Sequence, residues 1–367
     1  MSGSKHGQNR NRWLPWAALA GALVVGGVAG GAIVAVTQSS AAPTSPSSAG
    51  SSQVSVCNVI SVANQVTPSV VTISASGRGG AGTGSGEVIQ ADGYILTNNH
   101  VIAIAADGGS VEVQFSDGQS APATITGRDR QTDLAVLKVD TSRKLQVIAM
   151  GSSSSVQVGE ATVVIGAPLG LSGTVTSGIV SALDRTIHVP AENDTTALLV
   201  GAIQTDASIN PGNSGGAMVN CSGQLIGVPT AGATVPSPSG ESSGGSIGLG
   251  FAIPSELAQT IANEIIATGS VTHAYFGLAT VALPPAAAAE GGVPEGLFVQ
   301  TVVPGGPSAQ AGLQPGDVIT KINGEPATSS VQLQELTLTK KPGDTVQLEY
   351  WRNGQSATAT VTLGAQP

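Results

Sequence analysis

An uninterrupted apolar segment, residues 13–36, dominates the hydropathy pattern of the first part of this 367-residue chain. The segment is rich in Ala, Gly, Val and Leu, and no charged residue follows until Arg78. A helix of this length spans about 36 Å, more than the hydrocarbon core of a bilayer at about 30 Å. Three positive charges precede the segment, all within residues 1–12. The positive-inside rule therefore predicts a single-pass membrane anchor, with the N-terminus in the cytoplasm and the rest of the chain outside.

A cleaved signal peptide is the alternative interpretation of this segment. The apolar region of a signal peptide usually has about 7–15 residues, fewer than are found here. The small residues at positions 40–42 nevertheless leave cleavage open. Residues 37–55 consist mainly of Ser, Ala, Pro and Gly, a composition that buries too little apolar surface to fold. We expect them to form a flexible tether.

From residue 56 onward, short alternating or apolar segments are separated by glycines and by Asp-Gly pairs, for example at 92–93, 107–108 and 117–118. This pattern is typical of β-strands joined by tight turns. It continues to about residue 253 with hardly any helical period. Two packed β-barrels of roughly 80–100 residues each would fit this stretch.

A helix is predicted after the strands, with Ser255 as its N-cap and Gly269 at its end. Leu257, Ile261 and Ile265 recur every four residues and would face the second barrel. Residues 271–367 then return to strand-like segments separated by a Pro/Ala/Gly-rich loop. We therefore expect a second, smaller domain there.

The amino-acid composition argues against several classes of function. Aromatic residues make up 3% of the chain and its net charge is −9, which argues against binding to nucleic acid. The two cysteines, Cys57 and Cys221, are too few for a disulfide scaffold or a zinc site. Outside the cytoplasm they can form one disulfide, and two buried thiols are the alternative. No P-loop motif is present, and the sequence indicates no cofactor and no metal.

Three polar residues stand where predicted strands begin or end. His100 closes ILTNNH, Asp133 opens TDLAVLKV, and Ser214 lies in the glycine-rich INPGNSGGAMV. A serine nucleophile needs a base, the base needs a carboxylate that fixes its tautomer, and the oxyanion needs backbone N–H donors. Glycines around Ser214 allow the unusual backbone conformations of such a donor pocket. The order His, Asp, Ser matches one known serine protease triad.

The segments TNNHV, TDLAVLKV and QTDASINPGNSGGAMVN resemble the catalytic segments of the HtrA/Deg family of trypsin-like serine proteases, and the resemblance covers roughly residues 60–365. It implies a mainly β chain, with a double β-barrel protease domain at 56–270 and a PDZ domain at 271–367. It also implies that His100 is the general base, Asp133 its orienting carboxylate and Ser214 the nucleophile. The backbone N–H groups of Gly212 and Ser214 would be the oxyanion donors.

The resemblance also suggests a substrate preference. Ser208 lies six residues before the nucleophile, where an acidic residue in trypsin-like enzymes selects Lys or Arg. Without that charge we expect small or medium apolar side chains to be preferred. The wall of this pocket is expected to include Leu249, Gly250 and Phe251. Two places depart from the usual family pattern, GAPLG at 166–170 and Pro229, and they affect loop positioning rather than the triad.

The C-terminal stretch PSAQAGLQPGDVITKING resembles a bacterial PDZ domain. The segment Tyr275–Phe276–Gly277–Leu278 then matches the loop that holds a peptide's C-terminal carboxylate, with the peptide added as a strand. In this family an Arg in the loop after the SGIVSA strand relays the signal of the PDZ domain to the oxyanion loop, and Arg185 occupies that position. The resemblance implies homotrimers as well.

Two functions from different classes follow. The first is an ATP-independent endopeptidase for unfolded or damaged extracytoplasmic proteins, regulated by peptides at the PDZ domain and acting in protein quality control and the stress response. The second is a non-catalytic, chaperone-like binder that uses only the PDZ domain. An intact triad favours the first.

Overall fold

The computed structural model describes residues 57–167, 173–190, 196–232 and 246–366. The predicted anchor (13–36) and tether (37–55) lie outside these residues and stay predictions. Within the described part of the chain, no helix has the length and apolar character needed to cross a membrane.

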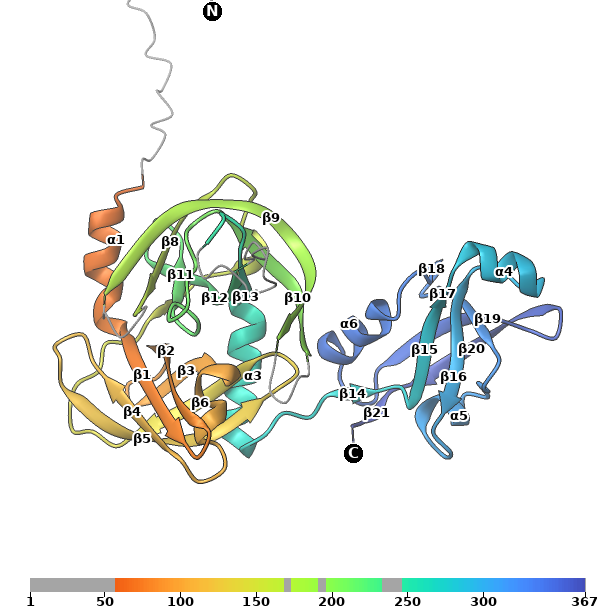
Figure 1. The fold of residues 1–367 in the computed structure, drawn as a ribbon, viewed down its shortest axis with the longest axis horizontal. Helices are drawn as coiled ribbons and strands as arrows, with labels where there is room; N and C mark the ends of the chain where they lie inside the picture. Colours follow the sequence, from red (N-terminus) through yellow and green to blue (C-terminus); the bar gives the residue numbers. More distant parts are fainter. Residues whose placement is uncertain (1–56, 168–172, 191–195, 233–245, 367) are drawn as a thin grey trace, which may run out of the picture. The chain divides into compact units, whose positions relative to one another are not determined.

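The first group of strands closes into a six-stranded antiparallel barrel, in the order β1-β2-β3-β6-β5-β4 (Figure 1). Alternation places Val111 and Val113 of β4 inside the barrel and the residues between them outside. The last strand, LAVLKV, is apolar on both faces because one face fills this barrel and the other packs against the second barrel. The elements are α1 (Val59–Val66), η1 (Thr67–Ser69), β1 (Val70–Gly77), β2 (Gly80–Val88), β3 (Tyr94–Asn98), α2 (Asn99–Ile102), η2 (Ala103–Ala105), β4 (Ser110–Gln114), β5 (Ser120–Asp129) and β6 (Leu134–Val139).

The second group of strands follows the order β11-β8-β9-β10-β13-β12, and β11 also pairs with β12, so that the strands form a ring (Figure 1). β7 adds to β12 in parallel. The two barrels match the pair predicted from the turn spacing. The elements are β7 (Ala149–Met150), η3 (Ser153–Ser155), β8 (Ala161–Gly166), β9 (Thr174–Pro190), β10 (Thr196–Thr205), β11 (Ala217–Val219), β12 (Gln224–Gly232) and β13 (Gly250–Pro254).

The predicted helix is confirmed as α3 (Ser255–Thr268), and it ends at Gly269 with a left-handed φ of +81°. Ile261 and Ile265 are buried in one cluster with residues of β6 and β12, so the helix packs on both barrels. The expected N-cap role of Ser255 is wrong. Pro254 is the N-cap, and the Ser255 hydroxyl instead donates to the carbonyl of Gly151 at 3.0 Å.

The C-terminal residues form a separate hydrophobic core around a sheet with the order β15-β16-β17-β19-β20. β18 pairs with β17, and β14 pairs with β21. The strand-like segments expected here are confirmed, and short helices lie between them. The elements are β14 (Ala274–Tyr275), β15 (Leu278–Leu283), α4 (Pro285–Gly291), β16 (Gly296–Val302), α5 (Pro307–Gln310), β17 (Val318–Ile322), β18 (Glu325–Pro326), α6 (Val331–Thr339), β19 (Thr345–Arg352), β20 (Gln355–Thr362) and β21 (Gly364–Ala365).

Candidate active site

His100 and Asp133 are in direct contact in the first barrel. His100 lies in α2, immediately after β3, and its Nδ1 is 2.8 Å from Oδ2 of Asp133. The backbone N–H of His100 donates to the other carboxylate oxygen at 3.0 Å. Because the carboxylate accepts a hydrogen bond from Nδ1–H, the proton of the neutral ring stays on Nδ1 and Nε2 is left as the basic nitrogen. The Asp133 side chain is 2% exposed and that of His100 is 35% exposed, so the base can be reached from solvent.

The carboxylate of Asp133 is held from several sides. Thr230 of β12 donates its hydroxyl to Oδ2 at 2.5 Å, so both barrels contribute to its position. The Asp133 backbone has a left-handed φ of +57°. Its carbonyl accepts hydrogen bonds from the Asn98 side chain at 2.8 Å and from the Asn99 backbone at 3.0 Å.

Ser214 lies in the loop between β10 and β11. Its Oγ donates to the carbonyl of Thr230 at 3.3 Å rather than to His100. Bonds between nucleophile and base are often long or missing until substrate binds. Within the part of the chain that the structure describes, the N–H groups of Gly212 and Ser214 donate to no protein acceptor. They are therefore available to an oxyanion.

Two glycines of this loop are required by its geometry. Gly212 has a φ of +102° and Gly215 has a φ of +78°, which other L-residues rarely adopt. A Cβ on Gly215 would also lie 2.4 Å from the carbonyl oxygen of Ser85. The N–H of Gly215 donates to the carbonyl of Pro229 at 2.9 Å. A proline fits at position 229 because only its carbonyl is used there.

The residues expected to line the substrate pocket come from two segments. The Ser208 carbonyl accepts bonds from the Thr176 hydroxyl at 3.0 Å and from the Asn213 side chain at 3.3 Å. Gly250 and Phe251 lie in β13 beside β10. A Cβ on Gly250 would be 2.6 Å from the side chain of Ile209, the neighbour of Ser208 in the chain.

The two segments therefore meet at Gly250, while the side chain of Leu249 is exposed. None of the four expected pocket residues carries a charge. The segment GAPLG, which departs from the family pattern, is described only at Gly166 and Ala167. Its residues 168–170 lie outside the described residues.

Arg185 does not lie in a loop, and that expectation is wrong. It lies within β9, paired with Ala202 of β10, because the two strands stay paired as far as Pro190 and Thr196. Register shifts accompany the pairing, and Asp184 has a left-handed φ of +54°. The Arg185 side chain is exposed and donates to the Gln204 side chain at 3.2 Å.

The segment Tyr275–Leu278 joins β14 to β15 in the C-terminal domain. Gly277 has a φ of +71°, and a Cβ there would lie 3.1 Å from Pro307 of α5. The Phe276 carbonyl accepts bonds from the backbone and the hydroxyl of Ser308, at 3.0 and 2.7 Å. A fixed glycine turn therefore lies between α5 and the edge strand β15.

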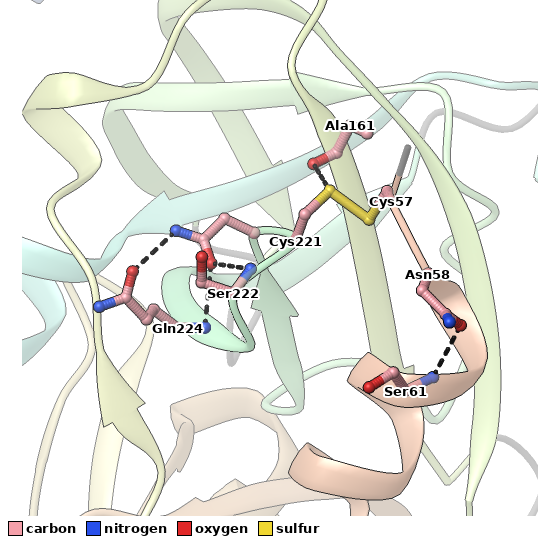
Figure 2. Close-up of a disulfide and its surroundings, with 8 residues drawn as sticks. Cys57, Asn58, Ser61, Ala161, Cys221, Ser222 and Gln224 are labelled. Atoms are coloured by element: carbon pink, nitrogen blue, oxygen red, sulfur yellow. Dashed lines mark hydrogen bonds between the residues drawn. A yellow bond between two sulfur atoms is a disulfide. The ribbon is translucent and has the colours of Figure 1, made fainter. Parts of the chain in front are cut away.

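Cys57 and Cys221 form a disulfide, which joins the chain two residues before α1 to the turn between β11 and β12 (Figure 2). Their Cα atoms are 5.1 Å apart, although 164 positions separate them in the chain. Figure 2 also shows Cys221 Sγ beside the Ala161 carbonyl, at 3.7 Å. The bond therefore links the N-terminal end of the described protease domain to its second barrel.

Sequence reasoning missed two contacts of the site. The first is the hydroxyl of Thr230 on Asp133, and the second is a set of bonds from Ser85 to the nucleophile loop, described below. Thr230 and Ser85 are both hydroxyl residues of β-strands, in QLIGVPTAG and GAGTGSGEV, and no local motif distinguishes them from ordinary strand residues. No cluster of three or more metal-ligating side chains occurs among the residues with described positions.

Comparison with known families gives two matches. A model described as a trypsin-like peptidase domain matches residues 84–228, and a PDZ domain model matches residues 271–363. The first match lies within the two barrels, and the second covers the C-terminal domain with its separate hydrophobic core.

Similar proteins are named proteases. Serine protease PepD of Mycobacterium tuberculosis is 42% identical over 314 residues, which covers 84% of this chain and 66% of that protein. Periplasmic pH-dependent serine endoprotease DegQ of Escherichia coli is 42% identical over 285 residues, covering 77% and 59%. The chain thus spans about three fifths of the length of these relatives.

Among solved structures, the HtrA-type protease AlgW with a decapeptide is 33% identical, with a TM-score of 0.69. That match covers 84% of this chain and 99% of the AlgW chain. The contact between His100 and Asp133 agrees with membership of the same family of proteases. The unbonded N–H groups of Gly212 and Ser214 agree with it as well. This chain therefore belongs to the HtrA/Deg family of trypsin-like serine proteases with a C-terminal PDZ domain.

Proposed function

We propose that the protein is a serine endopeptidase in which His100 is the general base, Asp133 orients it and Ser214 is the nucleophile. The contact between the His100 ring and the buried Asp133 carboxylate is the observation that carries the proposal. After His100 removes the Ser214 proton, Oγ attacks the peptide carbonyl and the N–H groups of Gly212 and Ser214 stabilise the oxyanion. His100 then gives the proton to the leaving amine.

The proposed substrates are unfolded or damaged proteins outside the cytoplasm. Ser208, Leu249, Gly250 and Phe251 themselves carry no charge, which favours a small or medium apolar residue at the cleavage site. Names of relatives such as DegQ include the word periplasmic, which supports an extracytoplasmic protease domain. The N-terminal membrane anchor and assembly into homotrimers belong to the same proposal.

The C-terminal domain is proposed to bind peptides with free C-termini. The peptide carboxylate would bind at the turn formed by Tyr275, Phe276, Gly277 and Leu278. β15 stands at the end of its sheet, so its outer edge can accept a peptide as an added strand. Solved relatives whose titles include a tripeptide or a decapeptide agree with a peptide ligand.

Peptide binding is proposed to favour the active arrangement of the oxyanion loop, with Arg185 as part of the connection. Such coupling typically amounts to about 1–3 kcal/mol, or roughly 5- to 150-fold. Apolar peptides with free C-termini should activate the wild type, amidated peptides should not, and Arg185→Ala should respond much less. A full response in Arg185→Ala would exclude this residue from the connection.

A fluorophosphonate probe tests the catalytic proposal directly. The wild type should be labelled and should cleave peptides, whereas Ser214→Ala should do neither. Ser222→Ala, which changes an exposed serine eight residues later, is the matched control and should behave as wild type. His100→Ala should lose as much activity as Ser214→Ala, with little further loss in the double variant. Labelling that persists in Ser214→Ala would refute the assignment, and a binder without catalysis would give no labelling in any variant.

A further inference from the structure

Ser85 is a fully buried serine of β2, at 0% exposure, with no role in the chemistry described so far. Along β2, Val88 lies in the barrel core, and a Cβ on Gly86 would meet the side chains of Ile73 and Ile95. Side chains alternate along a strand, so Ser85 faces out of the first barrel. It therefore lies between this barrel and the second one.

Every polar group of Ser85 has a partner. Its hydroxyl donates to the carbonyl of Gly212 at 2.7 Å and accepts from the N–H of Ala167 at 2.8 Å. Its own N–H donates to the carbonyl of Ser214 at 2.9 Å. Its carbonyl accepts from the Thr97 hydroxyl at 2.6 Å. Two of these bonds end on Gly212 and Ser214, the residues that supply both proposed oxyanion donors.

The bond from Ser85 to Gly212 restrains a residue whose backbone is flexible on its own. Glycine has a broad range of accessible φ and ψ angles, so the φ of +102° at Gly212 must be selected by its surroundings. With the carbonyl of Gly212 fixed by the Ser85 hydroxyl, the peptide unit after Gly212 can no longer rotate freely. The direction of the Gly212 N–H is then restrained from its C-terminal side.

We propose that Ser85 is a positioning residue for the oxyanion hole: it holds the carbonyls of Gly212 and Ser214 so that their N–H groups point at the reacting carbonyl. The inference rests on the proposed peptidase function. Loss of one oxyanion donor typically lowers kcat by about 10²–10³-fold. Ser85→Ala loosens a donor rather than deleting it, so we expect a loss of roughly 10- to 100-fold.

The matched control is Ser69→Ala. Ser69 is 1% exposed, and its hydroxyl also donates to a backbone carbonyl, that of Val66, at 2.7 Å. Both substitutions therefore remove a buried serine hydroxyl and leave a carbonyl without its donor. Ser85→Ala also removes the acceptor of the Ala167 N–H, and only Ser85 contacts the nucleophile loop. Ser85→Cys keeps a weak donor and should give an intermediate effect, and it serves if Ser85→Ala folds poorly.

The first measurement is kcat and KM on a peptide substrate, normalised to active sites counted with a fluorophosphonate, together with the affinity for a peptide aldehyde. Ser85→Ala should lose kcat and aldehyde affinity by the same factor, with KM changed by less than about threefold. Ser69→Ala should retain the kcat of the wild type. Wild-type kcat and aldehyde affinity in Ser85→Ala, or an equal loss in Ser69→Ala, would overturn the inference.

A second measurement separates this inference from the peptidase proposal. Amide hydrogen exchange of residues 210–216 should accelerate in Ser85→Ala and stay unchanged in Ser69→Ala, whether or not the protein cleaves peptides. If the wild type fails to cleave and to react with the probe, the proposed function fails, and exchange still decides the role of Ser85. Equal exchange in wild type and Ser85→Ala would show that Ser85 does not hold the loop.

Discussion

Glu87 is a fully buried carboxyl group, and replacing it by Gln should make the protease domain more stable at neutral pH. Glu87 lies two positions after Ser85 in β2, so both side chains point to the same face of the sheet. Glu87 pairs with Val70 of β1 and Leu96 of β3. Val70 and Leu96 belong to two different apolar clusters, so the carboxyl lies between them. Neither of its oxygens has a hydrogen-bond partner among the described residues.

Burial raises the pKa of Glu87 well above its ordinary value of 4.5, and the neighbouring backbone N–H of the same residue opposes this only in part. The folded state therefore holds a proton that the unfolded state releases above pH 4.5. The contribution of Glu87 to the free energy of unfolding is therefore fully present below pH 4.5. It is lost as the pH rises toward the raised pKa that Glu87 has in the folded state. The slope from this single group is at most about 1.4 kcal/mol per pH unit. Gln resembles the protonated carboxyl and removes the slope.

Urea unfolding followed by circular dichroism between pH 4 and pH 8 would measure this effect. Trp351 is the only tryptophan within the described residues and lies in the C-terminal domain, so fluorescence would not follow the barrels. Wild type and Glu87→Gln should be similar at pH 4 and diverge as pH rises. Glu112→Gln, at an exposed carboxylate of β4, controls for the change in net charge. A constant difference between wild type and Glu87→Gln at every pH would refute the reasoning.

Two further predictions concern the bonds that join distant parts of the protease domain. Cys57→Ser or Cys221→Ser should lower the free energy of unfolding, by up to about 5 kcal/mol in the chain-entropy model for a separation of 164 positions. Reductant should lower the wild-type unfolding midpoint and leave both variants unchanged, and two free thiols in the unreduced wild type would contradict this. Thr230→Val keeps the shape of the side chain but removes the donor to Asp133, so kcat should fall roughly tenfold. An unchanged kcat at equal stability would show that His100 alone positions the carboxylate.

The fold was largely predictable because its signals are local. Asp-Gly turns, alternation such as that of SVEVQ, and the four-residue repeat of Ile261 and Ile265 identify strands and a helix from neighbouring residues alone. The error at Ser255 has a tertiary cause. Its hydroxyl bonds to Gly151, about a hundred residues away, and this contact outweighs the local preference for an N-cap.

The site was predictable only in part, because some of its contacts join residues that are far apart in the chain. His100, Asp133 and Ser214 lie in short distinctive segments, so a family resemblance identifies them. Thr230 and Ser85 act through single hydroxyls whose partners lie 97 and 127 positions away. Nothing in the local sequence indicates those partners. Arg185 shows the opposite error, since a family position was expected in a loop and the strand simply continues.

Asp133 is where local preference and the geometry of the site oppose each other. A non-glycine residue at φ +57° costs about 1 kcal/mol or more, although Asp tolerates this conformation better than most residues. In this left-handed conformation the Asp133 carbonyl accepts hydrogen bonds from Asn98 and Asn99, and its carboxylate accepts one from the His100 N–H. Each of these bonds typically contributes about 0.5–1.5 kcal/mol, more where the carboxylate accepts, so together they offset the strain. The His100–Asp133 pair is thus held mainly by bonds within the first barrel, together with the Thr230 hydroxyl of the second. The Ser214 loop, in contrast, is bonded across the two barrels to Ser85.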